Sequence, residues 1–260
     1  MNIDLRDQVI LVTGSGRGIG KEIALMSAKA GANVVLTARS QDQLEEVAAE
    51  IVAINGTALV VPVDLCESTA VERLMKLTLD RFKRLDVVVN NAGTNNIANL
   101  VMLKEEDFRA VYELNVFAVF RLTKAAIRHM IPAKRGRIIN ISSISAKFGS
   151  SYNSAYASSK AAVLGFTRSV ARETAQFGIS SNAICPWHVD TELVHEAMGR
   201  RAKMFGKTGD KYLTEIVAGS PMKRLIKGRE VAGLALYLMS DEAAGITGQS
   251  LNVCGGVMMQ

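Results

Sequence analysis

Short runs of apolar and β-branched residues alternate along the first part of the chain with longer amphipathic stretches. Unbroken apolar runs are typical of strands that are buried on both faces of a sheet. The runs occupy residues 8–13, 33–39, 58–63 and 86–89. The amphipathic stretches predict helices with one face on the sheet, and they occupy residues 21–30, 41–54 and 67–82. This regular alternation predicts a parallel sheet covered by helices on both faces.

The second part of the chain continues the same pattern. The predicted elements are a strand at 137–143, a helix at 156–177, a strand at 179–185, a helix at 228–239 and a last strand at 249–253. Residues 191–222 interrupt the pattern with a long, charged, methionine-containing insertion. A long segment at this point is typical of an active-site lid, and a surface excursion without that role is the alternative.

Length and composition predict one domain. The chain has 260 residues, of which 48% are hydrophobic and 22% charged. It has four prolines and no low-complexity linker, so residues 1–260 are expected to form a single domain. Cys66, Cys185 and Cys254 lie far apart without a Cys-x-x-Cys pair, which predicts free thiols and no metal site.

The same features bear on location and partners. No signal-peptide pattern opens the sequence and no apolar stretch is long enough for a bilayer, so a cytoplasmic protein without a membrane partner is expected. The net charge is +6, but Lys and Arg are scattered among acidic residues without an aromatic-rich or helix-turn-helix pattern. This distribution favours an anionic cofactor or substrate over nucleic acid.

A glycine-rich turn follows the first predicted strand. Gly14, Gly18 and Gly20 fall between that strand and a predicted helix, with the spacing Gly-x-x-x-Gly-x-Gly. Glycine lets the backbone turn tightly and approach a pyrophosphate at a helix N-terminus. The turn therefore predicts a dinucleotide site, and a plain glycine-rich loop is the alternative.

The end of the second predicted strand bears on which dinucleotide is bound. A carboxylate there would bind the ribose 2′-hydroxyl of NAD, but the chain has Ala38 followed by Arg39. Arg39, helped by Arg17 of the glycine turn, would bind a 2′-phosphate through charge-assisted hydrogen bonds. These residues predict NADP(H).

A tyrosine and a lysine lie one helical turn apart at Tyr156 and Lys160. A neighbouring ammonium group favours phenolate and would lower the tyrosine pKa from about 10, which suits proton transfer to or from an alcohol oxygen. Ser143 ends a predicted buried strand, where its hydroxyl could bond the same oxygen. A surface Tyr/Lys pair beside a serine-rich turn is the alternative, because this spacing is common by chance.

Taken together, these motifs resemble the short-chain dehydrogenase/reductase family over nearly the whole chain. The motifs that carry the resemblance are Thr13-Gly14-x-x-x-Gly18-x-Gly20, Asn90-Asn91-Ala92-Gly93, Asn115, Ser143 and Tyr156-x-x-x-Lys160. The resemblance implies one Rossmann-type, doubly wound α/β domain with a seven-stranded parallel sheet and a substrate lid at about 191–222.

The resemblance also implies the roles of four residues. Tyr156 is the expected general acid/base, Lys160 lowers its pKa and binds the nicotinamide ribose, and Ser143 orients the substrate oxygen. Asn115 is expected to anchor a water in a proton relay to Lys160. Because asparagine is a poor helix former and Asn115 lies mid-helix by pattern, the resemblance further implies a local helix distortion there.

Most of the cofactor contacts are likewise implied by the resemblance. The expected residues are Gly14, Arg17, Gly18, Ile19, Gly20, Arg39, Asp64, Leu65, Asn91, Ala92, Gly93, Tyr156, Lys160, Val189 and Thr191. Asp64 and Leu65 would contact adenine, and Val189 and Thr191 the nicotinamide carboxamide. The chain departs from the family pattern at Trp187, which replaces a glycine after Pro186 and puts the loop conformation in question if that position needs positive φ.

The leading functional expectation is an NADP(H)-dependent carbonyl reductase or alcohol dehydrogenase acting on a small ketone or secondary alcohol. A 3-oxoacyl carrier-protein reductase is the first alternative. The resemblance implies that such enzymes dock the acidic carrier with two basic residues, of which Lys134 matches one, whereas Phe177 occupies the other position. A hydroxybutyrate dehydrogenase ranks lower because Asn153 replaces a basic residue. A non-catalytic dinucleotide sensor is the alternative of a different class. The resemblance further implies a homotetramer, with a dimer as the alternative.

Overall fold

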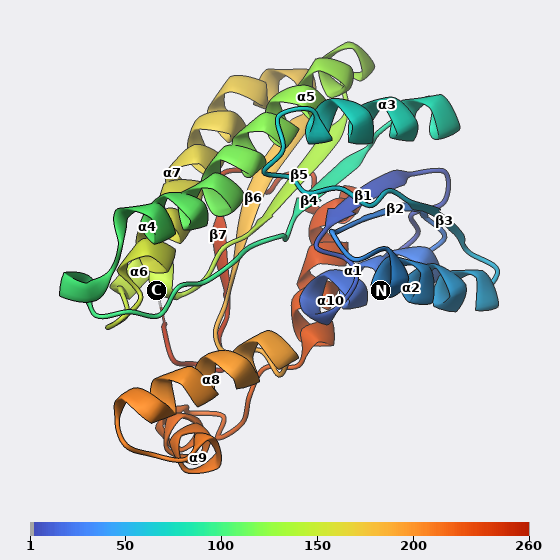
Figure 1. The fold of residues 1–260 in the computed structure, drawn as a ribbon. Coiled ribbons are helices and arrows are strands. Elements are labelled where there is room, and N and C mark those ends of the chain that lie inside the picture. Colours follow the sequence, from blue (N-terminus) through green and yellow to red (C-terminus); the bar gives the residue numbers. More distant parts are fainter. Residues whose placement is uncertain (1–2, 260) are drawn as a thin grey trace.

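The computed structural model describes residues 3–259, and their strands form a seven-stranded parallel sheet in the order β3-β2-β1-β4-β5-β6-β7 (Figure 1). The strands are β1 (Val9–Thr13), β2 (Asn33–Thr37), β3 (Thr57–Val60), β4 (Val87–Asn90), β5 (Gly136–Ile141), β6 (Ile179–Pro186) and β7 (Ser250–Val253). The sheet order reverses direction at β1, which lies between β2 and β4. The predicted doubly wound α/β fold is confirmed.

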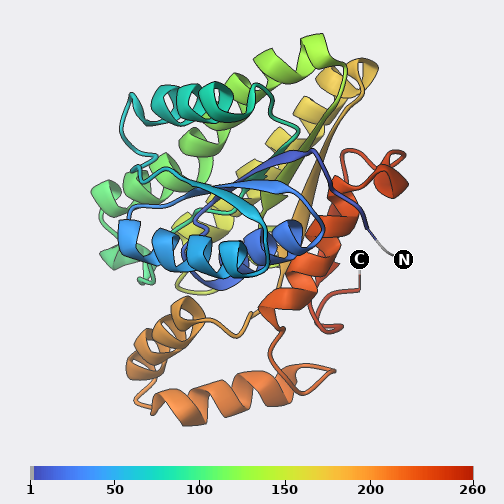
Figure 2. The same ribbon diagram turned by 90° about the vertical axis from the view of Figure 1, so that its right-hand side faces the viewer.

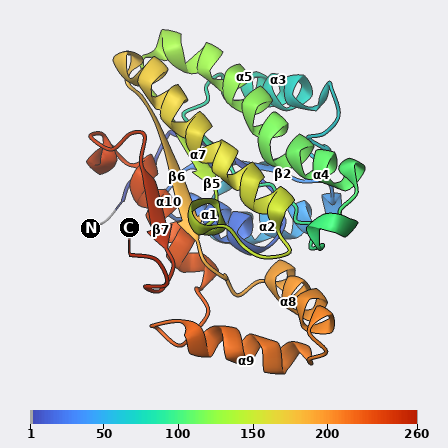
Figure 3. The ribbon, with the colours of Figure 1, turned by 90° about the vertical axis from the view of Figure 1, so that its left-hand side faces the viewer.

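Helices cover both faces of the sheet (Figures 1 and 3). On one face lie α1 (Gly18–Lys29), α2 (Gln41–Ala53) and α10 (Gly228–Met239). On the other lie α3 (Ala70–Phe82), α4 (Glu105–Tyr112), α5 (Ala118–Ala133) and α7 (Ser154–Thr174). Four short helical segments lie in the connections: η1 (Leu100–Met102), α6 (Ser145–Phe148), η3 (Ala175–Phe177) and η4 (Asp241–Ala243).

The apolar runs are continuous because each strand contributes to two cores. In β1, Ile10 and Val12 pack into the core under α1, α2 and α10, whereas Val9 and Leu11 pack into the core under α3 and α5. All four side chains are at most 1% exposed. Successive strand residues point to opposite faces, so a strand covered on both sides needs apolar residues at every position.

A π-helical segment, η2 (Glu113–Phe117), separates α4 from α5. Its centre is Asn115, which is fully buried. π-helical turns insert an extra residue into a helix and are frequent at functional sites. The implied helix distortion at Asn115 is therefore present.

The insertion at residues 191–222 folds into α8 (Glu192–Met204) and α9 (Gly209–Gly219). In Figures 1 and 2 this helix pair stands apart from the sheet, at the end where the strands finish. Parallel strands place the residues that follow them along one edge, and ligands of open α/β sheets bind there. The fold thus brings the insertion to the same edge as the glycine turn, Ser143 and Tyr156.

Among residues 3–259 we find no helix with the length and apolar character needed to cross a membrane. Over the same range, no group of three or more His, Cys, Asp or Glu side chains is arranged to hold a metal ion.

Candidate active site

The glycine turn after β1 leaves no room for side chains at its key positions. Gly14 and Gly18 have φ of +63° and +57°, a region that favours glycine. A Cβ on Gly20 would lie 2.3 Å from the Gly14 carbonyl oxygen and 2.5 Å from Nδ2 of Asn91. The turn is therefore packed directly against the loop after β4, and a side chain on Gly20 would disrupt this contact.

Thr13 ties these two loops together, although the prediction had not given it a role. Its Oγ1 accepts hydrogen bonds from the backbone N–H groups of Asn91 and Ala92, both at 2.9 Å. In return, Nδ2 of Asn91 donates to the carbonyl oxygens of Thr13 at 2.8 Å and of Gly14 at 3.1 Å. A polar residue at the end of a buried strand, facing an Asn-Asn pair, was the signal in the sequence.

The N-terminus of α1 is suited to an anion. Arg17 is the N-cap residue, but its side chain accepts no hydrogen bond from the backbone of the helix, and the first turn contains no acidic residue. Its free N–H groups and its dipole therefore favour a negative charge. Ile19 is half-buried in this turn.

The two arginines predicted to bind a 2′-phosphate differ in their surroundings. Arg17 forms an ion pair with Glu192 at the start of α8, with 3.0 Å between Nη1 and Oε2. Arg39 is exposed just beyond β2, and no carboxylate within residues 3–259 pairs with it. Arg39 is thus the cation that is free to meet an added phosphate.

Asp64 and Leu65 lie where the chain leaves the strand region of β3. Oδ1 of Asp64 accepts from the backbone N–H of Cys66 at 2.9 Å, which fixes the turn. The Leu65 side chain is 7% exposed, and its carbonyl oxygen accepts from Nη2 of Arg121 at 2.9 Å. Arg121 also pairs with Glu113 of the π-helical segment. This loop is therefore anchored to the helix that carries Asn115.

Ser143 and Tyr156 meet where β5 ends and α7 begins. Ser143 is 8% exposed, and its Oγ also accepts from the backbone N–H of Ser145 at 3.1 Å. Burial raises the pKa of the half-buried Tyr156 phenol above its ordinary 10.0, and the hydrogen bond from Ser143 offsets part of this shift. The expected lowering by Lys160 is not found, which corrects the prediction for this structure.

The position of Lys160 explains that difference. Its Nζ donates to the Ile141 carbonyl oxygen at 2.8 Å and lies 5.7 Å from the centroid of the Tyr156 ring. The ammonium group thus faces the ring and the end of β5. Burial, with the residue 5% exposed, lowers the pKa of Lys160 from 10.5 to about 8.

Asn115 connects the π-helical segment to the loop after β4 and to α7. Its amide exchanges hydrogen bonds with the backbone of Thr94 at 2.9 and 3.0 Å. Nδ2 also donates to Oγ of Ser159, which in turn donates to the Tyr156 carbonyl oxygen at 2.7 Å. Sequence reasoning missed Thr94 and Ser159 because their roles depend on contacts between distant elements.

Gly93 sits between Asn115 and Lys160. A Cβ built on Gly93 would lie 3.2 Å from Oδ1 of Asn115 and 3.3 Å from Nζ of Lys160. A side chain at Gly93 would crowd both the Asn115 amide and the Lys160 ammonium group. The four expected catalytic residues are thereby gathered at the carboxyl edge of the sheet.

The loop after β6 accepts Trp187 without backbone strain. Trp187 is not among the residues of the described chain that have positive φ, and its half-buried ring packs against the cores on both sides. Val189 is 2% exposed and bridges to Ile226, and Thr191 caps α8 by accepting from the Val194 N–H. The substitution of glycine therefore leaves the loop intact.

His188 neighbours Trp187, with 4.9 Å between ring centroids. Burial, with a smaller contribution from Arg201, lowers the pKa of His188 to about 4. The imidazole is therefore neutral at physiological pH, which suits a wall position better than a cationic role.

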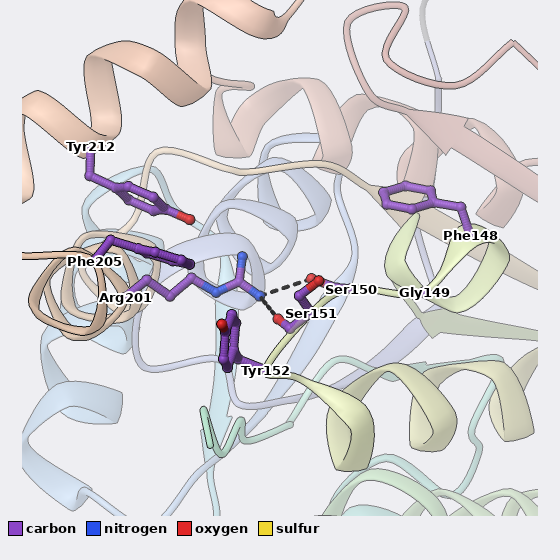
Figure 4. Close-up of a pocket in the computed structure, with 8 residues that line it drawn as sticks. All are labelled: Phe148, Gly149, Ser150, Ser151, Tyr152, Arg201, Phe205 and Tyr212. Carbon is purple, nitrogen blue, oxygen red and sulfur yellow. Dashed lines mark hydrogen bonds between the residues drawn. The ribbon is translucent and has the colours of Figure 1, made fainter. Parts of the chain in front are cut away.

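A pocket of about 510 Å³ opens between the segment that precedes Tyr156 and the α8–α9 insertion (Figure 4). One side consists of residues 148–152, and the other of Arg201 from α8, Phe205 directly after α8, and Tyr212 from α9. Its volume falls within the usual range for small-molecule sites. Arg201, Phe205 and Tyr212 belong to the insertion that was predicted as a lid, but residues 148–152 were not predicted, because no local pattern in the sequence relates the two segments.

A model of the short chain dehydrogenase family matches residues 8–201. The chain is 40% identical over 257 residues to a 3-oxoacyl-acyl-carrier-protein reductase of Synechocystis sp., covering 98% of each. It is 36% identical to a D-beta-hydroxybutyrate dehydrogenase of Rhizobium meliloti, covering 95% of this chain and 96% of the relative. Among solved structures, a variant of actinorhodin polyketide ketoreductase with NADPH has a TM-score of 0.94 at 33% identity, covering 99% of this chain and 98% of the other. The chain belongs to the short chain dehydrogenase family of oxidoreductases.

Proposed function

We propose that this protein is an NADP(H)-dependent ketoreductase that uses Tyr156 as general acid/base. The observation that carries the proposal is the arrangement of the Ser143 hydroxyl, the Tyr156 phenol and the Lys160 ammonium at the carboxyl edge of the sheet. A hydroxyl and a phenol that meet in a half-buried site are suited to bind one carbonyl oxygen from two sides. We further propose that residues 1–260 act as one domain and that α8 and α9 form the substrate lid.

The residues around the glycine turn fit a dinucleotide with a 2′-phosphate. Gly14, Gly18 and Gly20 form the turn that leads into α1, whose N-terminus has no side-chain cap, and a pyrophosphate would be bound there. Ala38 offers no carboxylate, and the exposed guanidinium of Arg39 would bind the 2′-phosphate. The solved ketoreductase with NADPH supports the same choice of cofactor. When bound, NADPH supplies the hydride that reduces the carbonyl carbon.

The chain's own residues manage the oxygen of the substrate. Because burial raises the pKa of Tyr156, the phenol stays protonated at neutral pH and can donate its proton to the developing alkoxide. Ser143 donates a hydrogen bond to the same oxygen and orients it. Lys160 lies on the face of the Tyr156 ring, with its Nζ 5.7 Å from the ring centroid, and there it would bind the nicotinamide ribose. This arrangement favours the reduction direction near neutral pH.

The experiment is to follow NADPH absorbance with a panel of ketones for the wild type and for Tyr156→Phe. The variant removes the proton donor but keeps the ring, so turnover should fall by about 10²–10⁴, the range for general acid–base catalysis, while NADPH binding is retained. Tyr237→Phe is the matched control, because Tyr237 lies in α10, on the face of the sheet opposite α7 and Tyr156. Near-normal turnover in Tyr156→Phe would refute the assignment.

A 3-oxoacyl group on a carrier protein is the second candidate substrate, and the named relatives favour it. Lys134 ends α5, and Phe177 lies in η3 directly before Gly178. A Cβ on Gly178 would lie 2.4 Å from the Lys134 carbonyl oxygen, so the two docking positions named from the sequence are neighbours in space. Only one of them carries a positive charge.

Comparing acetoacetyl groups on coenzyme A and on an acidic carrier protein tests this candidate. If the carrier docks at Lys134, kcat/KM should be higher with the carrier, and Lys134→Glu should remove that advantage while sparing the coenzyme A substrate. Equal rates on both substrates in the wild type would leave the free ketone as the proposed substrate.

A further inference from the structure

The pocket between residues 148–152 and the α8–α9 insertion combines exposed aromatic rings with a cation. Phe148 is 58% exposed and Phe205 is 45% exposed. Burying large apolar side chains away from water is favourable, so this exposure is costly in the free protein. Both rings line the pocket of about 510 Å³. Exposed apolar surface that is concentrated in a concave site is typical of ligand binding.

Three of the rings form an ordered wall. Tyr152 meets Phe205 edge-on, with centroids 5.5 Å apart and planes at 82°. Phe205 and Tyr212 are stacked at 5.8 Å with planes at 14°. Figure 4 shows these rings on one side of the lining and Phe148 on the other. Aromatic rings prefer such offset and edge-to-face contacts, and a planar ligand can extend the same arrangement.

Arg201 adds the charge. Its Nη2 donates to Oγ of Ser150 at 2.8 Å and to the carbonyl oxygen of Ser151 at 3.0 Å, and Figure 4 shows the guanidinium beside Tyr152 and Phe205. Within residues 3–259 it has no carboxylate partner. Its other N–H groups therefore remain available to an anion. Neighbouring His188 is neutral, with its pKa lowered to about 4, so it supplies no competing charge.

We propose that this pocket selects aryl ketones that carry a carboxylate, with the ring against Phe205 and the carboxylate on Arg201. The lining segment 148–152 ends two residues before the start of α7, the helix that carries Tyr156. This inference rests on the proposed function for its consequence in catalysis, but the binding that it predicts does not depend on turnover.

Binding can be measured without catalysis. Isothermal titration calorimetry gives the affinity of each ligand directly, without turnover. The probes are 4-acetylbenzoate, its methyl ester, and 6-oxoheptanoate, which places a ketone and a carboxylate at a similar separation without a ring.

We expect the wild type to bind 4-acetylbenzoate roughly ten- to a hundredfold more tightly than the ester, as a charge-assisted contact implies. Arg201→Gln should abolish this preference, and Arg201→Lys should keep part of it. Arg200→Gln is the matched control, because Arg200 is exposed on the same helix and outside the pocket lining. Phe205→Leu should remove the preference for 4-acetylbenzoate over 6-oxoheptanoate.

Equal wild-type affinity for the acid and the ester would overturn the inference. An equal loss of affinity for the acid and for the ester in Arg201→Gln would also overturn the inference. The arginine would then only hold α8 against the Ser150–Ser151 loop. The proposed function is tested separately, by measuring NADPH consumption with ketones. Selective binding of 4-acetylbenzoate without any ketone reduction would refute the ketoreductase and leave this inference standing.

Discussion

Replacing Lys160 by methionine should stabilise the folded protein at neutral pH, because the native fold buries an ammonium group. Folding lowers the pKa of Lys160 from 10.5 to about 8, so the unfolded chain binds this proton more tightly than the native state does. At pH 7 the difference corresponds to roughly 3 kcal/mol of lost stability at about 1.36 kcal/mol per pKa unit. Methionine has a similar length and no charge, so it removes this cost.

The pH dependence isolates the charge from other effects of the substitution. Between the native pKa of about 8 and the unfolded value of 10.5, the wild type gains stability as pH rises, since only the unfolded state still holds the proton. The advantage of the variant should therefore shrink by about 2.5 kcal/mol between pH 7 and pH 10. The Ile141 carbonyl loses its hydrogen bond in the variant at both pH values, so that cost cancels.

The assay is urea unfolding of the wild type and Lys160→Met at pH 7 and pH 10, without added dinucleotide. Lys147→Met is the control, because its Nζ also donates to a carbonyl oxygen, that of Ser250 at 2.8 Å, but the side chain is only half-buried. Its substitution should change the free energy of unfolding by a similar amount at both pH values. A constant difference between Lys160→Met and the wild type at both pH values would refute the reasoning.

Three further outcomes follow from the geometry. Gly20→Ala should lose about 1–3 kcal/mol of stability by urea unfolding, because its Cβ would lie 2.3 Å from a backbone oxygen. Gly233→Ala in α10 is the control, since its Cβ would meet nothing within 4 Å and the change should be neutral or stabilising. Equal effects of the two substitutions would contradict the packing argument. Arg39→Ala should weaken NADP(H) binding by roughly ten- to a hundredfold and leave NAD(H) binding unchanged in titrations, and a similar loss for both cofactors would count against a 2′-phosphate contact. Phe117 and Phe120 are 49% and 44% exposed on the η2–α5 face, which favours pairing with a second copy of the chain. Light scattering should therefore give a homotetramer, or a dimer if only this face pairs. A monomer at micromolar concentration would contradict the assembly.

The sequence by itself determined the sheet and its helices. Strands covered on both faces must be apolar at successive positions, and this rule made residues 8–13 and 33–39 recognisable without any knowledge of their neighbours. Gly14, Gly18 and Gly20 were equally readable, since their backbone conformation and close packing depend on the local turn. Tyr156 and Lys160 could be placed on one face because helical spacing is a local property.

Tertiary structure alone decided the electrostatics and the pocket. The sequence put an ammonium one turn from a phenol and predicted a lowered tyrosine pKa, but burial of both groups and the Ile141 carbonyl reversed the outcome. The sequence predicts Arg17 as a phosphate ligand, and only the fold shows that Glu192, from another part of the chain, forms an ion pair with it. The Arg201 pocket joins an insertion to a loop about fifty residues earlier. Desolvation and contacts between distant segments depend on the packed fold as a whole, so no local pattern in the sequence records them.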